Sequence, residues 1–235
     1  MVLLFERVGD GSLYEILHQK QERLSSSHIQ DIIVQISDSL VFLHEQNIIH
    51  CYVTSHAVMM INQRCAKLAN FEYVVDSHRV DVGRRSFVNQ NMYQNVAYNW
   101  MAPEIMRGNQ PVMASDVYSL TVVIWEMLHG EIPWGRYDTE SVRQKVVRDK
   151  EQLQIENDKI PDVFKFILEF GLQLDPLHRR LQMCNIRNVL SIPAKSVEQY
   201  IDRLLRQEIE EKDVKLQTGK SSKGGSKPAR PPKPR

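Results

Sequence analysis

The side chains in this sequence that could bind metal ions or act as nucleophiles include eight histidines and three cysteines. Cys51, Cys65 and Cys184 are far apart and form no CxxC pair and no Cys/His pattern of the kind that binds zinc. The histidines show no ligand spacing either. An odd number of scattered cysteines provides no disulfide framework, so the sequence predicts a reducing compartment and no metal site.

The elements that would position any such residues are mainly helical. Apolar residues recur at helical spacing from Ile29 to Leu43, which predicts a long helix with a core-facing stripe that ends near Asn47. Residues 114–129 are apolar on most sides, as is typical of a central buried helix. Ser12 follows a glycine break and is a plausible cap for a helix from Leu13 to Lys20. Three further helices are predicted, over 139–149, 161–174 and 194–213.

The region between the two main helices has a different pattern. Short β-leaning runs alternate with polar breaks, which predicts small strands at Ile48-Ile49, Val58 to Ile61, Ala66 to Ala69 and Tyr73 to Val75, besides one at residues 2–7. Residues 76–100 are polar and predict a long exposed loop, and loops of that length are usually functional or mobile. Tyr93 and Tyr98 in this region are candidates for phosphorylation, the alternative being ordinary loop tyrosines.

Six short motifs occur in an order and at intervals that resemble the C-terminal lobe of a protein kinase. They are a strand and hinge at Leu3 to Val8 with Phe5 in the gatekeeper place, His50 of H-R-D, Asn70-Phe71-Glu72 in place of D-F-G, an intact Ala102-Pro103-Glu104, Asp116-Val117-Tyr118-Ser119 with the later Ile132-Pro133-Trp134, and Asp175-Pro176 followed by Arg179. The resemblance implies an α+β fold, a kinase-like C-terminal lobe that is mainly α-helical with small β-hairpins.

Longer phrases narrow the resemblance. Four longer stretches are similar to the family of testis-expressed inactive kinases of germ-cell intercellular bridges. They are LLFERVGDGSLYEILH, AKLANFEYVVDS, YNWMAPEI and SDVYSLTVVIWEMLHGEIPW. This implies cytoplasmic localisation, including the midbody or the intercellular bridge, and protein partners among midbody or cytoskeletal components. The G-P-P-x-x-x-Y segment by which that family engages a midbody protein is absent, because Pro231-Pro232 follows an arginine and no tyrosine comes after.

The resemblance also implies that the charged residues of phosphate transfer have been replaced. Tyr52 stands in place of the aspartate that accepts the substrate proton, and a phenol with a pKa near ~10 is a poor base at neutral pH. The neighbouring arginine is Cys51, and the metal-binding asparagine is Ala57. Asn70 replaces the D-F-G aspartate and offers Mg²⁺ one neutral oxygen, while Glu72 replaces its glycine.

The start of the sequence adds to these losses. The chain begins at the strand before the hinge, so the resemblance implies that the N-terminal lobe, with its Gly-rich loop, strand lysine and helix glutamate, is largely absent. The hinge residues Phe5, Glu6, Arg7 and Val8 would then be vestigial. Losing one oxyanion-type stabiliser typically costs about 10²–10³ in rate. We therefore predict a pseudokinase that is not an enzyme and holds neither ATP nor Mg²⁺.

The retained kinase residues are architectural. Glu104 and Arg179 resemble the ion pair that links the end of the activation segment to the later helices. Asp116 is expected to anchor the backbone of the former catalytic loop. His50 and Phe71 resemble the C-terminal half of the hydrophobic spine. A retained scaffold without catalysis is the pattern of a protein that works by binding other proteins.

The end of the sequence differs in composition from the rest, so we divide the chain into a kinase-like domain at 1–192, an amphipathic helix at 193–214 and a basic, disordered tail at 215–235. The tail has seven basic residues and no acidic ones, whereas residues 1–214 have 23 basic and 29 acidic residues. A mildly acidic body predicts no specific nucleic-acid binding, and no apolar run reaches the ~20 residues of a membrane span. The residues of a possible SH3 ligand are Pro228, Pro231, Lys233, Pro234 and Arg235.

The sequence leaves two alternatives to the inactive scaffold open. One is a protein kinase with residual ATP binding or phosphate transfer. The other is an adaptor that acts through an SH3 domain bound to its proline-rich tail.

Overall fold

The structure is a computed structural model, and it describes residues 9–78, 96–155, 160–179, 181–193, 195–204 and 206. The chain divides into two compact units, Met1–Ser191 and Ile192–Arg235. In the second unit the described residues form a helix over 195–204, within the range predicted from the sequence. The rest of that predicted helix and the whole basic tail lie outside the described residues.

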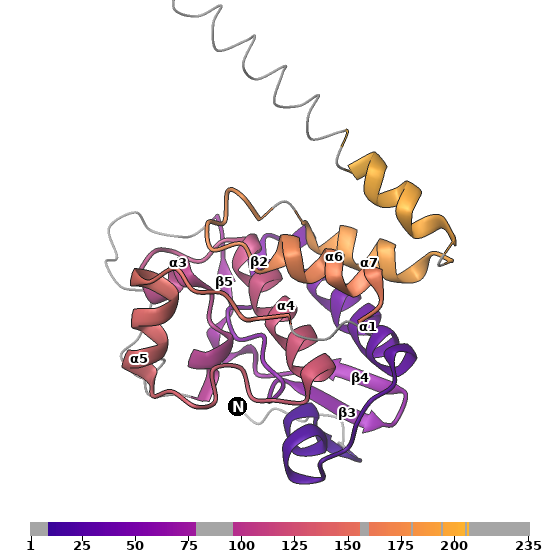
Figure 1. Ribbon diagram of the computed structural model, residues 1–235, viewed down its shortest axis with the longest axis horizontal. Helices are drawn as coiled ribbons and strands as arrows, with labels where there is room; N and C mark the ends of the chain where they lie inside the picture. Colours follow the sequence, from indigo (N-terminus) through magenta and orange to yellow (C-terminus); the bar gives the residue numbers. More distant parts are fainter. Residues whose placement is uncertain are drawn as a thin grey trace, which may run out of the picture. The chain divides into compact units, whose positions relative to one another are not determined.

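The first unit begins with a short strand and a helical turn (Figure 1). β1 (Gly11–Ser12) leads into a helix at Leu13 that continues as a wider, π-helical turn over Glu15–Gln19. Ser12 Oγ accepts a hydrogen bond from the Glu15 N–H, and Glu15 Oε2 accepts one from the Ser12 N–H. This reciprocal cap satisfies two N–H groups at the helix start. The predicted helix with Ser12 as its cap is confirmed.

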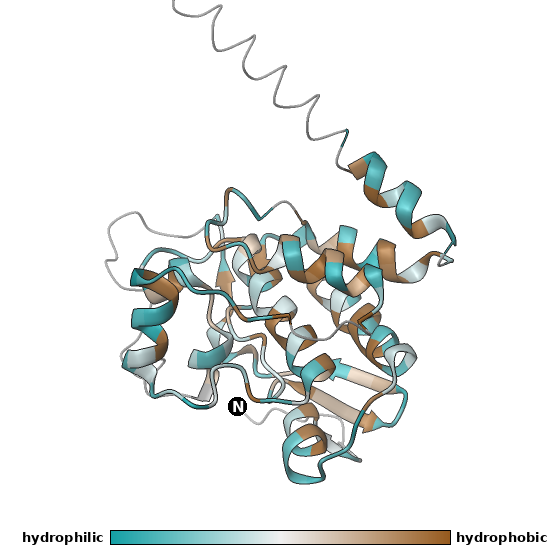
Figure 2. Ribbon diagram, in the orientation of Figure 1, coloured by the Kyte–Doolittle hydropathy of each residue, from teal (hydrophilic) through white to brown (hydrophobic). Residues whose placement is uncertain are grey.

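The long helix α1 (Ser26–Glu45) packs against one side of the unit. Ser25 caps its first turn by accepting a hydrogen bond from the His28 N–H. The predicted stripe is buried, since Ile29, Ile33 and Leu40 have 2% or less of their surface exposed. Figure 2 shows both hydrophobic and hydrophilic residues on α1, as expected of a helix with one buried side.

Two small antiparallel sheets follow. In the first, β3 (Val58–Asn62) lies between β1 and β4 (Cys65–Leu68). In the second, β2 (Ile48–Ile49) pairs with β5 (Val75–Asp76), with Ile48 opposite Asp76. These strands fix both ends of the segment between Ile49 and Val75, which contains most of the candidate site.

The central helix α4 (Met113–His129) is buried over 12 of its 17 residues, as its apolar composition predicted. It contacts α1 and α6 (Asp162–Gly171), and α1 also packs against α7 (Met183–Ser191). The other helical elements among the described residues of this unit are 3₁₀ turns at Phe71–Tyr73 and Val96–Trp100, α3 (Pro103–Met106), α5 (Thr139–Arg143) and a π-helical turn at Gln144–Arg148. Helices with small antiparallel sheets make this an α+β fold.

Several sequence predictions were wrong in detail. Residues 96–100, expected in an exposed loop, form a buried turn in which Tyr98 and Trp100 are 2% and 1% exposed. Tyr98 packs with Met106 and Val146, so it is not the accessible loop tyrosine expected for phosphorylation. The helix predicted at 161–174 ends at Gly171.

The strand expected at Tyr73 to Val75 is displaced. Residues Phe71–Tyr73 form a 3₁₀ turn, and the strand lies at Val75–Asp76. The helix α7 was not predicted at all. None of the helices in the described part of the chain is long and apolar enough to cross a membrane.

Candidate functional site

The centre of the candidate site is Asp116, which reaches from the first turn of α4 to the segment after β2. Its Oδ2 accepts hydrogen bonds from the His50 N–H at 2.8 Å and from His44 Nε2 at 2.9 Å. Its Oδ1 accepts one from the Cys51 N–H at 2.9 Å. A carboxylate that accepts three hydrogen bonds is well compensated for its burial, and Asp116 is 1% exposed. The structure therefore places Asp116 where it fixes the backbone of the former catalytic loop.

His50 is fully buried, and both of its ring nitrogens form hydrogen bonds with backbone groups. Its Nε2 donates to the Ala69 carbonyl at 3.0 Å, and its Nδ1 accepts from the Tyr52 N–H at 3.3 Å. This pattern requires the neutral tautomer with the proton on Nε2. Burial lowers the pKa of His50 below its ordinary value, which favours the same neutral form. The Phe71 ring meets the imidazole edge-on at 5.1 Å, so the two residues of the expected spine are in contact.

Two residues of the site have left-handed backbone conformations. Cys51 has φ of 64° and Asn70 has φ of 63°. Asparagine tolerates this region, whereas a cysteine there is strained and persists only where its surroundings hold it. The two hydrogen bonds from Asp116 to the backbone of His50 and Cys51 provide that restraint. Burial raises the pKa of the Cys51 thiol, so it is not an activated nucleophile.

Tyr52, in the place of the proton acceptor, stacks on Tyr73 from the following turn. The ring centroids are 4.8 Å apart and the planes differ by 17°. Burial raises the pKa of Tyr52 above its ordinary value, and neighbouring Tyr73 and Glu72 raise it further. The raised pKa keeps the phenol protonated at neutral pH, and a protonated phenol is a poor proton acceptor.

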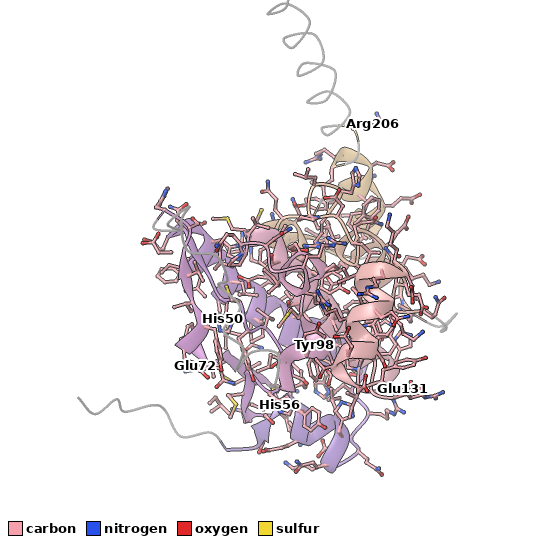
Figure 3. The ribbon with its side chains drawn as sticks, turned by 90° about the vertical axis from the view of Figure 1, so that its left-hand side faces the viewer. His50, His56, Glu72, Tyr98, Glu131 and Arg206 are labelled. Carbon is pink, nitrogen blue, oxygen red and sulfur yellow. The ribbon has the colours of Figure 1, made fainter. Side chains whose placement is uncertain are left out.

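Ala57 and Glu72 are two further candidate residues. Ala57 is fully buried and linked to the D-F-G-like segment, because its carbonyl accepts a hydrogen bond from the Ala69 N–H at 2.8 Å. Its methyl side chain offers no ligand to a metal. Glu72 is exposed, on the same side of the unit as His50 (Figure 3). Among the described residues, no group of three His, Cys, Asp or Glu side chains could hold a metal ion.

A second polar cluster lies apart from this site. Arg179, whose side chain is fully buried, donates to both oxygens of Glu104, at 2.8 Å to Oε1 and 3.1 Å to Oε2. The guanidinium also donates to the carbonyls of Ala114 and Gln173. The Ser115 hydroxyl adds a hydrogen bond to Glu104 at 2.7 Å. The pair thus connects α3, the start of α4 and the segment before α7.

Sequence reasoning missed a buried carboxylate on α4. Glu126 is 0% exposed and accepts hydrogen bonds from the Ser55 hydroxyl at 2.7 Å and Trp100 Nε1 at 2.7 Å, and it contacts His18 Nε2 at 2.8 Å. Burial raises the pKa of Glu126, and these hydrogen bonds oppose that effect. One signal was available in the sequence, because Glu126 is an acidic residue within an otherwise apolar stretch of helix.

Some predicted site residues cannot be placed. The hinge residues Phe5, Glu6, Arg7 and Val8 lie outside the described residues, as does Tyr93. The same is true of the SH3-ligand residues Pro228, Pro231, Lys233, Pro234 and Arg235. The structure thus brings together His50, Tyr52, Asn70, Phe71 and Asp116, and places Glu104 with Arg179 in a separate cluster.

Comparison with known sequences identifies the family. Residues 1–190 match the family described as protein tyrosine and serine/threonine kinase. The chain belongs to the protein kinase family. Two similar relatives are the inactive serine/threonine-protein kinases TEX14 of Mus musculus, 29% identical over 192 residues, and of Bos taurus, 30% identical over 192 residues.

Each of these alignments covers 80% of this chain but only 13% and 12% of the two relatives, so the chain spans a small part of their length. A third relative, the mitogen-activated protein kinase kinase kinase 13 of Homo sapiens, is 28% identical over 178 residues, which are 75% of this chain and 17% of that protein. The expected resemblance to inactive kinases is therefore confirmed at the level of sequence.

Proposed function

We propose that the protein is a catalytically inactive kinase that acts as a scaffold for other proteins. The observation that carries the proposal is the Tyr52–Tyr73 stack at the position of the proton acceptor. Phosphate transfer depends almost entirely on positioning and on electrostatic stabilisation of the phosphates and the nucleophile. A protonated phenol in a ring stack provides neither a base nor a negative charge.

The metal positions support the same proposal. Mg²⁺ is usually bound through one or two carboxylates together with the substrate phosphates. Here the two positions are Ala57, which has no ligand atom, and Asn70, which has a neutral oxygen. We infer that the protein does not hold the magnesium ions that neutralise a transferred phosphate. The exposed carboxylate of Glu72 adds a negative charge on the same side as His50, which opposes phosphate binding.

Two buried hydrogen-bond networks favour a scaffold over a decaying enzyme. Asp116 accepts hydrogen bonds from two backbone N–H groups, and Arg179 donates to both oxygens of Glu104, at distances of 2.8 to 3.1 Å. These bonds are retained although Tyr52, Ala57 and Asn70 differ from the residues expected of an active kinase. Such networks fix the relative positions of the loop, α3 and α4. A fold whose loop and helices are held in fixed positions can present a constant surface to a protein partner.

The test is a phosphate-transfer assay with radiolabelled ATP and a general protein substrate. We expect no transfer above a blank without protein. A matched variant, Asn70→Ala, distinguishes real activity from a contaminating kinase, because only activity of this protein would change. Transfer by the natural chain that Asn70→Ala abolishes would overturn the proposal. A triple variant with Tyr52→Asp, Ala57→Asn and Asn70→Asp measures whether the replaced residues alone account for the inactivity.

We further propose that the partners are proteins of the midbody or intercellular bridge. The support is the sequence similarity of the kinase-like region to the inactive kinases TEX14. The G-P-P-x-x-x-Y segment is absent from this sequence, which counts against the bridge mechanism of that family, so the proposed contact rests on the kinase-like region alone. A fluorescently tagged chain should accumulate at midbodies of dividing cells. Uniform cytoplasmic fluorescence through abscission would contradict this part of the proposal.

A second candidate function is supported by a three-residue repeat in the tail. A proline recurs at every third position and is preceded each time by a basic residue, as in Lys227-Pro228, Arg230-Pro231 and Lys233-Pro234. A polyproline II helix has three residues per turn, so these prolines would share one face in that conformation. Aromatic grooves of SH3 domains recognise such faces.

The repeat provides its own control. A peptide of residues 226–235 should bind at least one SH3 domain in a panel, and Pro231→Ala should abolish binding. Pro232→Ala changes a proline outside the repeat and should have a much smaller effect. Equal losses from the two substitutions would contradict recognition of one proline face.

A further inference from the structure

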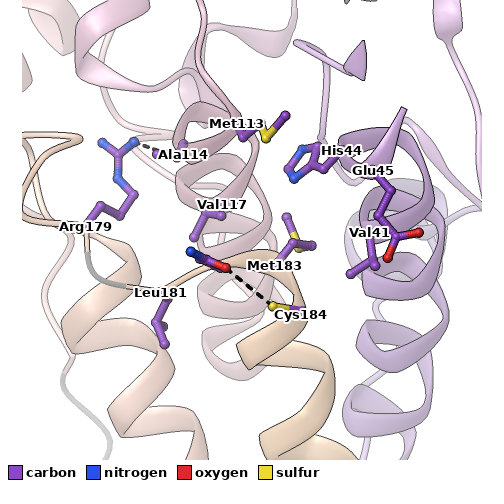
Figure 4. A pocket seen from close by; sticks show the side chains of 11 residues that line it. Val41, His44, Glu45, Met113, Ala114, Val117, Arg179, Leu181, Met183 and Cys184 are labelled. Carbon is purple, nitrogen blue, oxygen red and sulfur yellow. Dashed lines mark hydrogen bonds between the residues drawn. The ribbon is translucent and has the colours of Figure 1, made fainter. Parts of the chain in front are cut away.

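A pocket of about 390 Å³ opens between the end of α1, the start of α4 and the segment that leads into α7 (Figure 4). Pockets of about 300–1,000 Å³ are typical of small-molecule sites. The walls are mainly aliphatic, and the lining includes Val41, Met113, Val117, Leu181 and Met183. Methionine side chains adapt to ligands of different shapes. The pocket is therefore suited to the apolar part of a small molecule.

The arginine in the pocket lining has no free donor for an anionic ligand. A guanidinium group has five N–H donors, and those of Arg179 are all used within the protein. The Nε–H donates to the Gln173 carbonyl, the two Nη1–H groups donate to Glu104 Oε1 and the Ala114 carbonyl, and the two Nη2–H groups donate to Glu104 Oε2 and the Gln173 carbonyl. Among the described residues, Arg179 is the only lysine or arginine of the lining. A carboxylate or phosphate head group would therefore find no free cationic donor among them.

Two acceptors without a donor lie on the α1 side of the pocket. His44 Nε2 donates to the Asp116 carboxylate at 2.9 Å, so Nδ1 of the neutral ring is an acceptor. No described residue donates a hydrogen bond to this Nδ1 or pairs with the exposed carboxylate of Glu45. Figure 4 shows the His44 ring and the Glu45 carboxylate at the end of α1. Both groups favour a ligand that donates hydrogen bonds, and Glu45 favours one with a positive charge.

The α7 side of the pocket adds polar groups without charge. Cys184 Sγ donates a weak hydrogen bond to Gln182 Oε1 at 3.7 Å (Figure 4). Because Arg179 is neutralised by Glu104, Glu45 is the one uncompensated charge of the described lining. A ligand that carries a positive charge at one end of an apolar body complements this combination.

We propose that the pocket binds an amphiphilic primary amine. The aliphatic part lies against Val117, Leu181 and Met183, and the ammonium group lies at the α1 side, where the Glu45 carboxylate and His44 Nδ1 accept its hydrogen bonds. The ammonium stays in contact with water because Glu45 is exposed, so binding does not require the burial of a charge. A fatty acid would instead place a second negative charge beside Glu45.

The proposed site is separate from the former catalytic residues. None of the replaced catalytic positions is in the described lining of the pocket. His44 shares the Asp116 carboxylate with the backbone N–H groups of His50 and Cys51, so the pocket adjoins the former catalytic loop. The proposal goes beyond the scaffold function and does not rest on it.

Cys184 provides a local readout of binding because it lines the pocket and is partly exposed. The test is alkylation of the full chain by iodoacetamide at slightly alkaline pH, where alkylamines are protonated, with the rate at each cysteine measured by mass spectrometry. Octylamine should slow the alkylation of Cys184 in a saturable way. Cys65, which is also partly exposed but does not line the pocket, should react at an unchanged rate.

Ligands that differ in one feature test each part of the proposal. Octanol has the chain without the charge and should protect Cys184 less well than octylamine. Octanoate reverses the charge and should be at least about fivefold weaker than octylamine. Butylamine has the charge with half the chain and should be at least about tenfold weaker, because less apolar surface is buried.

The decisive variant is Glu45→Lys. Lysine is favourable at the C-terminal end of a helix, so the variant should fold. The octylamine concentration that gives half-maximal protection of Cys184 should rise at least about threefold, and octanoate should become the better ligand. Glu131→Lys makes the same charge reversal at an exposed position outside this pocket and should alter the binding of neither ligand.

Three results would overturn the proposal. They are no protection of Cys184 at millimolar octylamine, equal protection by octylamine and octanoate, and an unchanged preference for octylamine in Glu45→Lys. Equal slowing of the reaction at Cys65 would show that the effect is not local and would overturn the proposal as well.

Discussion

Replacing Arg179 by alanine should destabilise the protein severely. The guanidinium makes two hydrogen bonds to the Glu104 carboxylate, at 2.8 and 3.1 Å, and further ones to two backbone carbonyls. Its side chain is 0% exposed and that of Glu104 is 3% exposed. The substitution therefore leaves a buried carboxylate that loses its counterion and keeps its hydrogen bond from the Ser115 hydroxyl.

The size of the effect follows from this burial. Removing one partner of a buried ion pair typically costs about 3–5 kcal/mol, because the other charge stays in the interior without compensation. For a domain of this size, 1 kcal/mol corresponds to roughly 2–4 °C, so the melting temperature should fall by roughly 6–20 °C. The control is Lys165→Ala, since Lys165 lies 3.7 Å from Asp162 in an exposed pair, and such pairs are worth less than about 1 kcal/mol.

Urea unfolding followed by tryptophan fluorescence gives the free energies of unfolding. The double variant with Glu104→Gln and Arg179→Ala should be less destabilised than the sum of the two single variants, because the neutral amide no longer needs a counterion. A loss below about 1 kcal/mol for Arg179→Ala, or additive effects in the double variant, would refute the reasoning.

Three further outcomes follow from the described contacts. Asp116→Asn should lower the free energy of unfolding by about 2–4 kcal/mol, because one carboxylate oxygen becomes an amide nitrogen that faces the N–H of either His50 or Cys51; denaturant titration measures this. Gly171→Ala should cost about 1–3 kcal/mol in the same assay, because the added Cβ would overlap the Thr121 side chain. Burial lowers the pKa of His50, so the unfolded chain binds more protons below about pH 6.5 and stability should fall as the pH drops through this range. Urea titrations at several pH values should show a weaker fall for His50→Gln than for the natural chain.

The helical framework could be predicted from the sequence because its apolar residues follow the helical period. Ile29, Ile33 and Leu40 specify the buried side of α1, and the even distribution of apolar residues specifies the central position of α4. α7 was missed because its sequence, Met183 to Ser191, has four buried residues among polar ones. These residues, Met183, Ile186, Val189 and Leu190, do recur at helical spacing, but the segment is short, and its packing against α1 could not be read from the sequence.

The site was predictable to the extent that it depends on motifs. The position of Asp116 beside the backbone of His50 was expected from the resemblance to protein kinases. The stacking of Tyr52 on Tyr73 and the cluster around Glu126 could not be predicted, because each depends on contacts between segments far apart or on side-chain rotamers. The burial of Trp100 could not be predicted either, because it lies at the end of a polar segment and its indole N–H donates to Glu126, a residue distant in the sequence.

The most direct test of the inactive scaffold is a calorimetric titration of Mg·ATP into the protein purified from its own cells. We predict no saturable heat up to millimolar nucleotide, and no difference between titrations with and without Mg²⁺, because Ala57 has no ligand atom and Asn70 offers only a neutral oxygen. Saturable binding that requires Mg²⁺ would contradict the account and would favour a kinase with residual nucleotide chemistry.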